Sequence, residues 1–202
     1  MNALETMLRT VAGSLRDRHL PWALVGGLAV SVRTEPRFTR DIDVAVAVED
    51  DRAAERLVFD LSASGFRALA TVEQDQTHRL ATARLAPTGE TGTGLMLDIL
   101  FASSGIEAEI CRAAEPVEVF PGTRVPVASL PHLVALKILS RDDRTRPQDA
   151  ADLRRLIEMA EDRDFNGALE ACRLIEERQF NRTRDLARAL TEAWDACRQR
   201  VD

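Results

Sequence analysis

The chain has 202 residues, 45% of them hydrophobic and 30% charged, which is the composition of an ordinary soluble protein with one large core or two small ones. No apolar run approaches the ~20 residues of a membrane-spanning helix. The N-terminus lacks the basic segment followed by an apolar segment that a signal peptide has, so we expect a cytoplasmic protein. Three widely spaced cysteines and three histidines argue against a disulfide framework or a zinc site, and the net charge of −6 provides no overall attraction to nucleic acid.

The N-terminal region predicts a helix, a short strand and a glycine turn. Apolar residues recur at helical spacing over 3–18, and the sequence WALV at 22–25 predicts a short buried strand. Gly26 and Gly27 follow directly, ahead of a helix of small residues. Glycines at such a junction let the backbone approach a ligand closely, and the free amides of a helix N-terminus suit phosphate. A plain turn would have the same pattern, so its interpretation depends on the residues that follow.

A polar spacer leads from the glycine turn to a second strand, which opens with two aspartates. Side chains alternate along a strand, so Asp41 and Asp43 project from the same face, with α-carbons roughly 6.6 Å apart. Like charges at this spacing repel each other unless a cation lies between them, and Mg²⁺ prefers such hard oxygen ligands. The spacer side chains would lie near a phosphate held by the glycine turn, unless they are ordinary solvated loop residues. They are Arg33, Arg37, Thr39 and Arg40.

The middle of the chain contains a second isolated carboxylate. The pattern predicts a helix over 51–64, strands over 66–72 and 79–85, a hairpin loop over 87–94 and a strand over 95–101. Asp98 is the one polar side chain in the last of these strands, GLMLDILF, where an unpaired carboxylate would be costly. A structural aspartate that caps a loop is one explanation. The functional explanation is that this strand lies beside the strand of Asp41 and Asp43 and completes a carboxylate triad.

The pattern changes near residue 128. We expect a helix over 103–112, strands over 115–120 and 124–127, and then helices over 130–142, 147–161, 165–178 and 182–199. The sequence therefore predicts an α+β fold. An α/β domain over residues 1–128, with a mixed sheet flanked by helices, would be followed by an all-helical domain over residues 129–202.

One lysine stands out among the basic residues. Of 27 basic residues, 26 are arginine and the remaining one is Lys137. Arginine replaces lysine poorly where a compact ammonium is needed, so Lys137 is a candidate for lysine-specific chemistry, with chance survival as the alternative. Asp149 and Asp152 share one face at the start of the next predicted helix. Acids there often complement the helix dipole, but the arginines around them favour a polar cluster with Lys137.

Three carboxylates, a glycine turn, arginines and a distinctive lysine are typical of phosphoryl or nucleotidyl transfer. The glycine turn, the DID strand and the later strand aspartate together resemble the polymerase-beta-like nucleotidyltransferase superfamily. A longer pattern resembles its AbiEii-type toxin branch, which includes the MenT toxins, over roughly residues 20–155. It consists of GGLA at 26–29, RFTRDID at 37–43, and Lys137 ahead of RTRPQDAADL at 144–153.

The resemblance implies a nucleotidyltransferase fold and the Mg²⁺-dependent transfer of a nucleoside monophosphate from an NTP to an acceptor hydroxyl. Two Mg²⁺ ions would be held by Asp41, Asp43 and Asp98, and Asp98 would help to activate the acceptor. The catalytic residues would be Asp41, Asp43, Asp98, Lys137 and Asp149. The nucleotide would be bound by Gly26, Gly27, Thr39, Arg40, Lys137 and Asp152, with Asp149 or Asp152 orienting Lys137. Many relatives have Gly-Ser in place of Gly-Gly, so a hydroxyl contact to phosphate would be missing.

The acceptor is left open. In toxins of this family it is often the 3′ end of tRNA, and an antitoxin protein is an implied partner. A small-molecule, antibiotic-type nucleotidyltransferase would share every residue named above, and the acidic net charge favours it, because affinity for tRNA depends on phosphate contacts. A non-catalytic nucleotide-binding relative is the other alternative, and the intact carboxylate triad argues against it.

Overall fold

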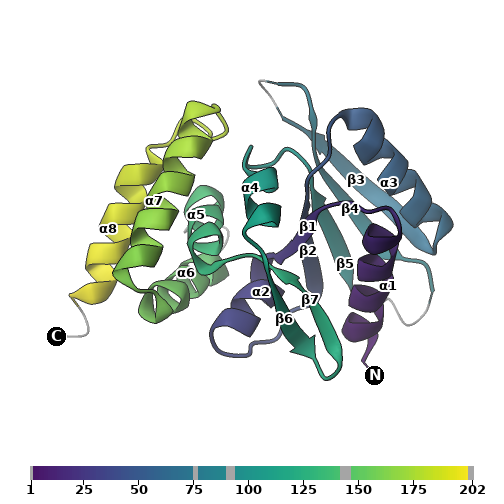
Figure 1. Ribbon diagram of the computed structural model, residues 1–202, viewed down its shortest axis with the longest axis horizontal. Coiled ribbons are helices and arrows are strands. Elements are labelled where there is room, and N and C mark those ends of the chain that lie inside the picture. Colours follow the sequence, from purple (N-terminus) through teal and green to yellow (C-terminus); the bar gives the residue numbers. More distant parts are fainter. Residues whose placement is uncertain (1, 75–76, 90–93, 142–146, 200–202) are drawn as a thin grey trace.

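A computed structural model describes residues 2–74, 77–89, 94–141 and 147–199 (Figure 1). Within these ranges the first part of the chain forms a mixed seven-stranded sheet with helices, and only helices follow after Val127. The predicted α+β architecture is confirmed, because the change from strands to helices lies where the pattern placed it. The division into domains at residue 128 remains a prediction. No helix in the described ranges is both long enough and apolar enough to cross a membrane.

The sheet has the strand order β3-β4-β5-β2-β1-β7-β6. Its strands are β1 (Trp22–Val25), β2 (Asp41–Val46), β3 (Phe66–Glu73), β4 (Leu80–Pro87), β5 (Met96–Leu100), β6 (Glu115–Phe120) and β7 (Thr123–Val127). At its centre β2 runs parallel to β5 and antiparallel to β1. The strands β4 and β5 pair antiparallel, as the predicted hairpin requires. Residues 90–93 of that hairpin's loop lie outside the described ranges, as do residues 144–146 of the family pattern.

The helices are α1 (Ala3–Asp17), α2 (Gly26–Arg33), α3 (Asp51–Ala63), α4 (Glu107–Arg112), α5 (Leu130–Ser140), α6 (Pro147–Met159), α7 (Asp162–Glu177) and α8 (Leu186–Arg198). Figure 1 shows α5 to α8 gathered on the side of the sheet away from α3. Local signals explain the ends of α3. The carboxylate of Asp50 accepts a hydrogen bond from the amide of Ala53 at 2.8 Å, and Gly65 follows the helix with a φ of +94°.

The core lies against the apolar face of the central strands. Ile42, Val44 and Val46 of β2 are fully buried, and so are Leu97 and Ile99 of β5. Because side chains alternate along each strand, this burial turns the aspartates between them to the opposite face. The alternation predicted for the strand of Asp41 and Asp43 is therefore present, and β5 shows the same alternation.

The helix expected over 103–112 begins later than predicted. The structure starts α4 at Glu107, whose buried Oε1 accepts hydrogen bonds from the amides of Ser103 and Ser104 at 2.8 and 2.7 Å. The hydroxyl of Ser104 donates to the same oxygen at 2.9 Å. These contacts hold the two serines in a bend ahead of the helix, so their amides are satisfied without a further helical turn.

Candidate active site

The strands that carry the aspartates are neighbours in the sheet. In the parallel register of β2 and β5, Asp43 lies directly opposite Asp98. Asp41 precedes Asp43 by two residues and so shares its face. All three side chains line one cavity of about 710 Å³. The structure thus brings together the three carboxylates that the sequence singled out.

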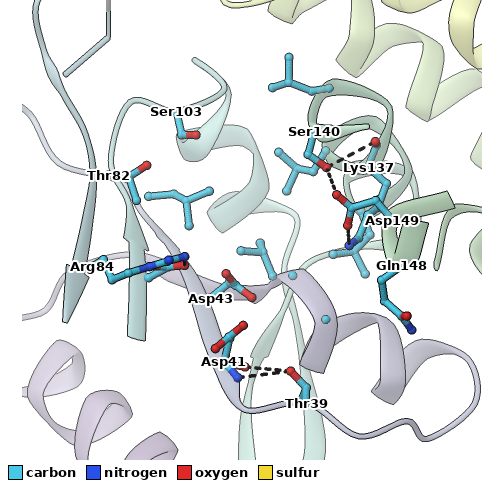
Figure 2. Close-up of a pocket in the computed structure, with 18 of the residues that line it drawn as sticks. Thr39, Asp41, Asp43, Thr82, Arg84, Ser103, Lys137, Ser140, Gln148 and Asp149 are labelled. Carbon is cyan, nitrogen blue, oxygen red and sulfur yellow. Dashed lines mark hydrogen bonds and ion pairs between the residues drawn. The ribbon is translucent and has the colours of Figure 1, made fainter. Parts of the chain in front are cut away.

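The cavity has two sides, with the carboxylates of β2 between them. Figure 2 shows Asp41 and Asp43 in the middle of the view. One side is formed by Thr82, Arg84 and Ser103, from β4 and the bend after β5. The other side is formed by Lys137, Ser140, Gln148 and Asp149, from α5 and the start of α6. Two different groups could therefore approach the carboxylates from opposite directions.

The environment of Asp43 disfavours its negative charge. Burial, followed by the charges of Asp98 and Asp41, raises the pKa of the Asp43 carboxyl to about 7. The ammonium of Lys137 and the backbone amide of Gly27 oppose this shift of the pKa, but they do not cancel it. A cation close to Asp43 would stabilise the carboxylate, because it would offset the repulsion among the three acids.

A divalent metal fits this donor set only in part before substrate binds. Within the described ranges, no group of three or more His, Cys, Asp or Glu side chains is arranged to hold a metal ion. Asp98 is engaged elsewhere, since Nε and Nη2 of Arg84 donate to its two oxygens at 2.8 and 2.6 Å. Asp41 and Asp43 remain as hard oxygen ligands, and Mg²⁺ is often held by one or two carboxylates together with phosphate oxygens. The residues present therefore fit Mg²⁺ that arrives with a phosphate.

Lys137 is clamped between two aspartates. Its side chain is 11% exposed, and Nζ donates to Oδ1 of Asp149 at 2.5 Å and lies 2.9 Å from Oδ2 of Asp152. The sequence left open which of the two acids orients the lysine, and the structure shows that both contact it. Asp152, which is fully buried, also accepts two hydrogen bonds from the guanidinium of Arg37, at 2.8 and 2.7 Å. The expected cluster of the lysine with both acids is present.

The spacer residues take different directions. Arg37 and Thr39 line the cavity, as expected for residues near a phosphate. Arg33 instead pairs with Glu115 at 2.7 Å. Arg40, which we expected to bind nucleotide, lies with its guanidinium 5.4 Å from the centre of the exposed Phe38 ring and is not among the residues that line the cavity. Its contact with nucleotide remains a prediction, because the structure shows this side chain against Phe38 and not in the cavity.

The glycine turn lies against the charged groups of the site. Gly26 has a φ of +66°, and Gly27 follows it in the first turn of α2. A β-carbon added at Gly27 would lie 2.5 Å from Nη2 of Arg37. The space that a serine side chain would fill at this position is therefore occupied by an arginine guanidinium, which is itself a phosphate-binding group.

Several cavity residues were not singled out from the sequence. They are Thr82, Arg84, Ser103, Ser140, Gln148 and Arg182. A signal existed for two of them, because Thr82 and Arg84 alternate with the buried Ala81, Ala83 and Leu85 in one strand. The alternation shows that the two polar side chains share a face, and the predicted hairpin pairs β4 with β5, but neither signal shows that Arg84 lies opposite Asp98.

Comparisons with known proteins agree with the fold. The family model for the nucleotidyl transferase AbiEii toxin, Type IV TA system, matches residues 9–202. No curated protein matches the chain. An antigenic nucleotidyltransferase-like protein from Paracoccidioides brasiliensis superimposes with a TM-score of 0.56 at 20% identity, over 93% of this chain and 92% of that one.

Two further solved structures share the fold. JHP933 from Helicobacter pylori superimposes with a TM-score of 0.50 at 16% identity, over 97% of this chain and 89% of that one. The lincosamide antibiotic adenylyltransferase LnuA, solved with lincomycin bound, has a TM-score of 0.50 at 15% identity, over 79% of this chain and 100% of that one. At these identities the likeness shows the fold and leaves the acceptor open.

Proposed function

The chain belongs to the AbiEii nucleotidyltransferase toxin family, and we propose that it transfers a nucleoside monophosphate from an NTP to a hydroxyl of an RNA acceptor, such as the 3′ end of tRNA, in a Mg²⁺-dependent reaction. One observation carries the proposal. Asp43 and Asp98 lie opposite each other on neighbouring strands and face a cavity whose far side presents the ammonium of Lys137. Carboxylates and a fixed cation on opposite sides of one cavity suit a triphosphate that lies between them.

The bonds of the reaction assign a role to each group. The acceptor oxygen forms a bond to the α-phosphorus of the NTP, and the bond from that phosphorus to the bridging oxygen breaks, so pyrophosphate leaves. Asp98 takes the proton of the acceptor hydroxyl. Asp41 and Asp43, together with the second oxygen of Asp98, would hold Mg²⁺, which supplies positive charge to the phosphates when bound.

The remaining residues bind and orient the triphosphate. Lys137 donates to phosphate oxygens, and its contacts with Asp149 and Asp152 keep the ammonium in place before the nucleotide arrives. Gly26 and Gly27 bring the backbone close to the same cavity. Arg37, held by Asp152 beside the turn, offers a second cation there.

Incubation of the purified protein with each labelled NTP, Mg²⁺ and total RNA tests the proposal. The double variant Asp41→Ala and Asp43→Ala should lose transfer of label, because the metal ligands are gone. A matched control removes two exposed aspartates away from the cavity, Asp17→Ala and Asp195→Ala, and should keep transfer. Undiminished transfer by the first variant would overturn the proposal.

A small-molecule acceptor is the second candidate. The net charge of −6 favours it, because an acidic protein attracts a phosphate-rich acceptor poorly. Label that appears on an aminoglycoside or a lincosamide and not on RNA would support this candidate. Triphosphate binding without turnover, in Mg²⁺ and with a full panel of acceptors, would instead support a non-catalytic relative.

A further inference from the structure

Arg84 holds the carboxylate that the reaction needs. It lies directly opposite Asp98 in the antiparallel register of β4 and β5, so Asp43, Asp98 and Arg84 form a row across three strands. Both oxygens of Asp98 accept hydrogen bonds from the Arg84 guanidinium, at 2.8 and 2.6 Å. The Arg84 side chain is nevertheless 50% exposed, on the wall of the same cavity.

Arg84 and a divalent cation compete for Asp98. The guanidinium occupies the oxygens that a metal would use, and a cation beside Asp98 would repel it. The ion pair is bidentate, but the Arg84 side chain is 50% exposed and can leave toward solvent, and a divalent cation has twice the charge of arginine. A cation bound at Asp98 would therefore release the Arg84 side chain into the cavity.

The released guanidinium would lie on the acceptor side. Thr82 precedes Arg84 by two residues on the same strand face, and Ser103 lies on the same side of the cavity (Figure 2). The carboxylate of Glu107 fixes the bend that presents Ser103. Lys137 and the glycine turn supply the phosphate-binding groups elsewhere in the cavity, so the side with Thr82, Arg84 and Ser103 is left for the acceptor.

We propose that Arg84 is an acceptor-binding residue that exchanges partners: it pairs with Asp98 until a divalent cation takes that carboxylate, and it then binds a phosphate of the acceptor. A guanidinium fork matches the oxygens of a phosphate, and it would repel a polycationic small molecule. The inference rests on the proposed function and adds to it the residue that binds a phosphate of the acceptor. The acceptor has a phosphate close to its reacting hydroxyl, as in a nucleic acid strand.

The exchange of partners by Arg84 is tested by measuring how tightly the protein binds bulk deacylated tRNA in the absence of NTP. Fluorescence anisotropy over a salt series gives this affinity. In Mg²⁺, Arg84→Ala should weaken binding about tenfold and lower the slope of log affinity against log salt by about 0.7 to 1, the loss of one phosphate contact. In EDTA, the two proteins should bind tRNA alike. The control Arg67→Ala removes the same charge from an exposed position on β3 and should match the wild type in both conditions.

A second measurement separates this role from a structural one. Without tRNA, Arg84→Ala should bind Mn²⁺ about threefold to tenfold more tightly in a calorimetric titration, because no guanidinium has to be displaced. A purely structural arginine would weaken metal and tRNA binding together. If Arg84→Ala does not fold, Arg84→Gln removes the charge while keeping a hydrogen-bonding side chain of moderate length.

Equal tRNA affinity and salt slope for wild type and Arg84→Ala in Mg²⁺ would overturn the inference, as would an equal loss of affinity in EDTA. If the wild type transferred nucleotide to tobramycin and not to RNA, the inference that the acceptor is anionic would be wrong. Failure of the proposed function has a different signature. If the wild type transfers no label but binds tRNA through Arg84 in a metal-dependent way, the proposed enzymatic activity is refuted. The exchange of partners by Arg84 is then still supported.

Discussion

A β-carbon added at Gly26 would lie 1.9 Å from Oδ2 of Asp43. The backbone of the glycine turn therefore lies directly against one of the candidate metal ligands. Gly26 also has a φ of +66°, a conformation that other residues rarely adopt. The position of Asp43 thus requires glycine at residue 26, because a side chain there would push the carboxylate from its place.

The two glycines should differ in their tolerance of alanine. Gly26→Ala should lower the free energy of unfolding by about 2 to 4 kcal/mol, from the clash with Asp43 and the positive φ. Gly27→Ala meets the end of the Arg37 side chain, which can move, and should cost about 1 kcal/mol. Urea unfolding of the two variants measures the difference, and equal losses would contradict the importance of the Gly26 contact.

Stability should depend on pH through Asp43. Its pKa is raised from 3.8 to about 7, chiefly by burial, so between these values the folded state holds a proton that the unfolded chain has released. This contribution to stability is fully present below about pH 4 and is lost as the pH rises to about 7. With metal chelated, Asp43→Asn should be more stable than wild type by on the order of 2 kcal/mol at about pH 8.

Urea unfolding in EDTA over this pH range measures the effect for both proteins. At about pH 4 the difference between wild type and Asp43→Asn should disappear, because both side chains are then neutral. Added Mg²⁺ should stabilise the wild type at about pH 8 more than it stabilises Asp43→Asn. A difference between the two proteins that does not change with pH would show that the Asp43 carboxylate is not destabilised by its surroundings.

Lys137 should not be replaceable. Lys137→Met leaves the largely buried Asp149 without its cation and should cost about 3 kcal/mol of unfolding free energy, part of which Asp149→Asn should restore in the double variant. Lys137→Arg keeps the charge, but a guanidinium is too bulky for a site between two aspartates, so NTP affinity measured by calorimetry should fall. If Lys137→Arg bound NTP as tightly as the wild type does, the site would not require a lysine, and its presence at this position would be due to chance.

Glu107 should stabilise the bend that presents Ser103. Glu107→Ala deprives the amides of Ser103 and Ser104 of their acceptor and should cost about 2 to 3 kcal/mol. Glu107→Gln keeps an acceptor oxygen and should cost much less. Burial raises the pKa of the Glu107 carboxyl, so the neutral amide also avoids the cost of a buried charge. Thermal unfolding of the two variants checks this, and a loss as large for Gln as for Ala would contradict the role of the acceptor.

The sequence by itself determined the local parts of this protein. Alternation along a strand put Asp41 and Asp43 on one face, and the apolar neighbours of Asp98 marked it as a carboxylate that needs a partner. Helical spacing placed Asp149 and Asp152 on one side of α6, ready to meet Lys137. These predictions succeeded because each depends on residues that are close in the chain.

The tertiary structure alone decided the register between strands. The predicted hairpin already made β4 and β5 neighbours, but only the register sets Asp98 opposite both Asp43 and Arg84. The loop before β2 turned Arg37 inward to Asp152 and Arg40 outward to Phe38, although both have the same side chain. Periodicity assigns a side chain to a face, whereas its partners depend on contacts between residues far apart in the chain.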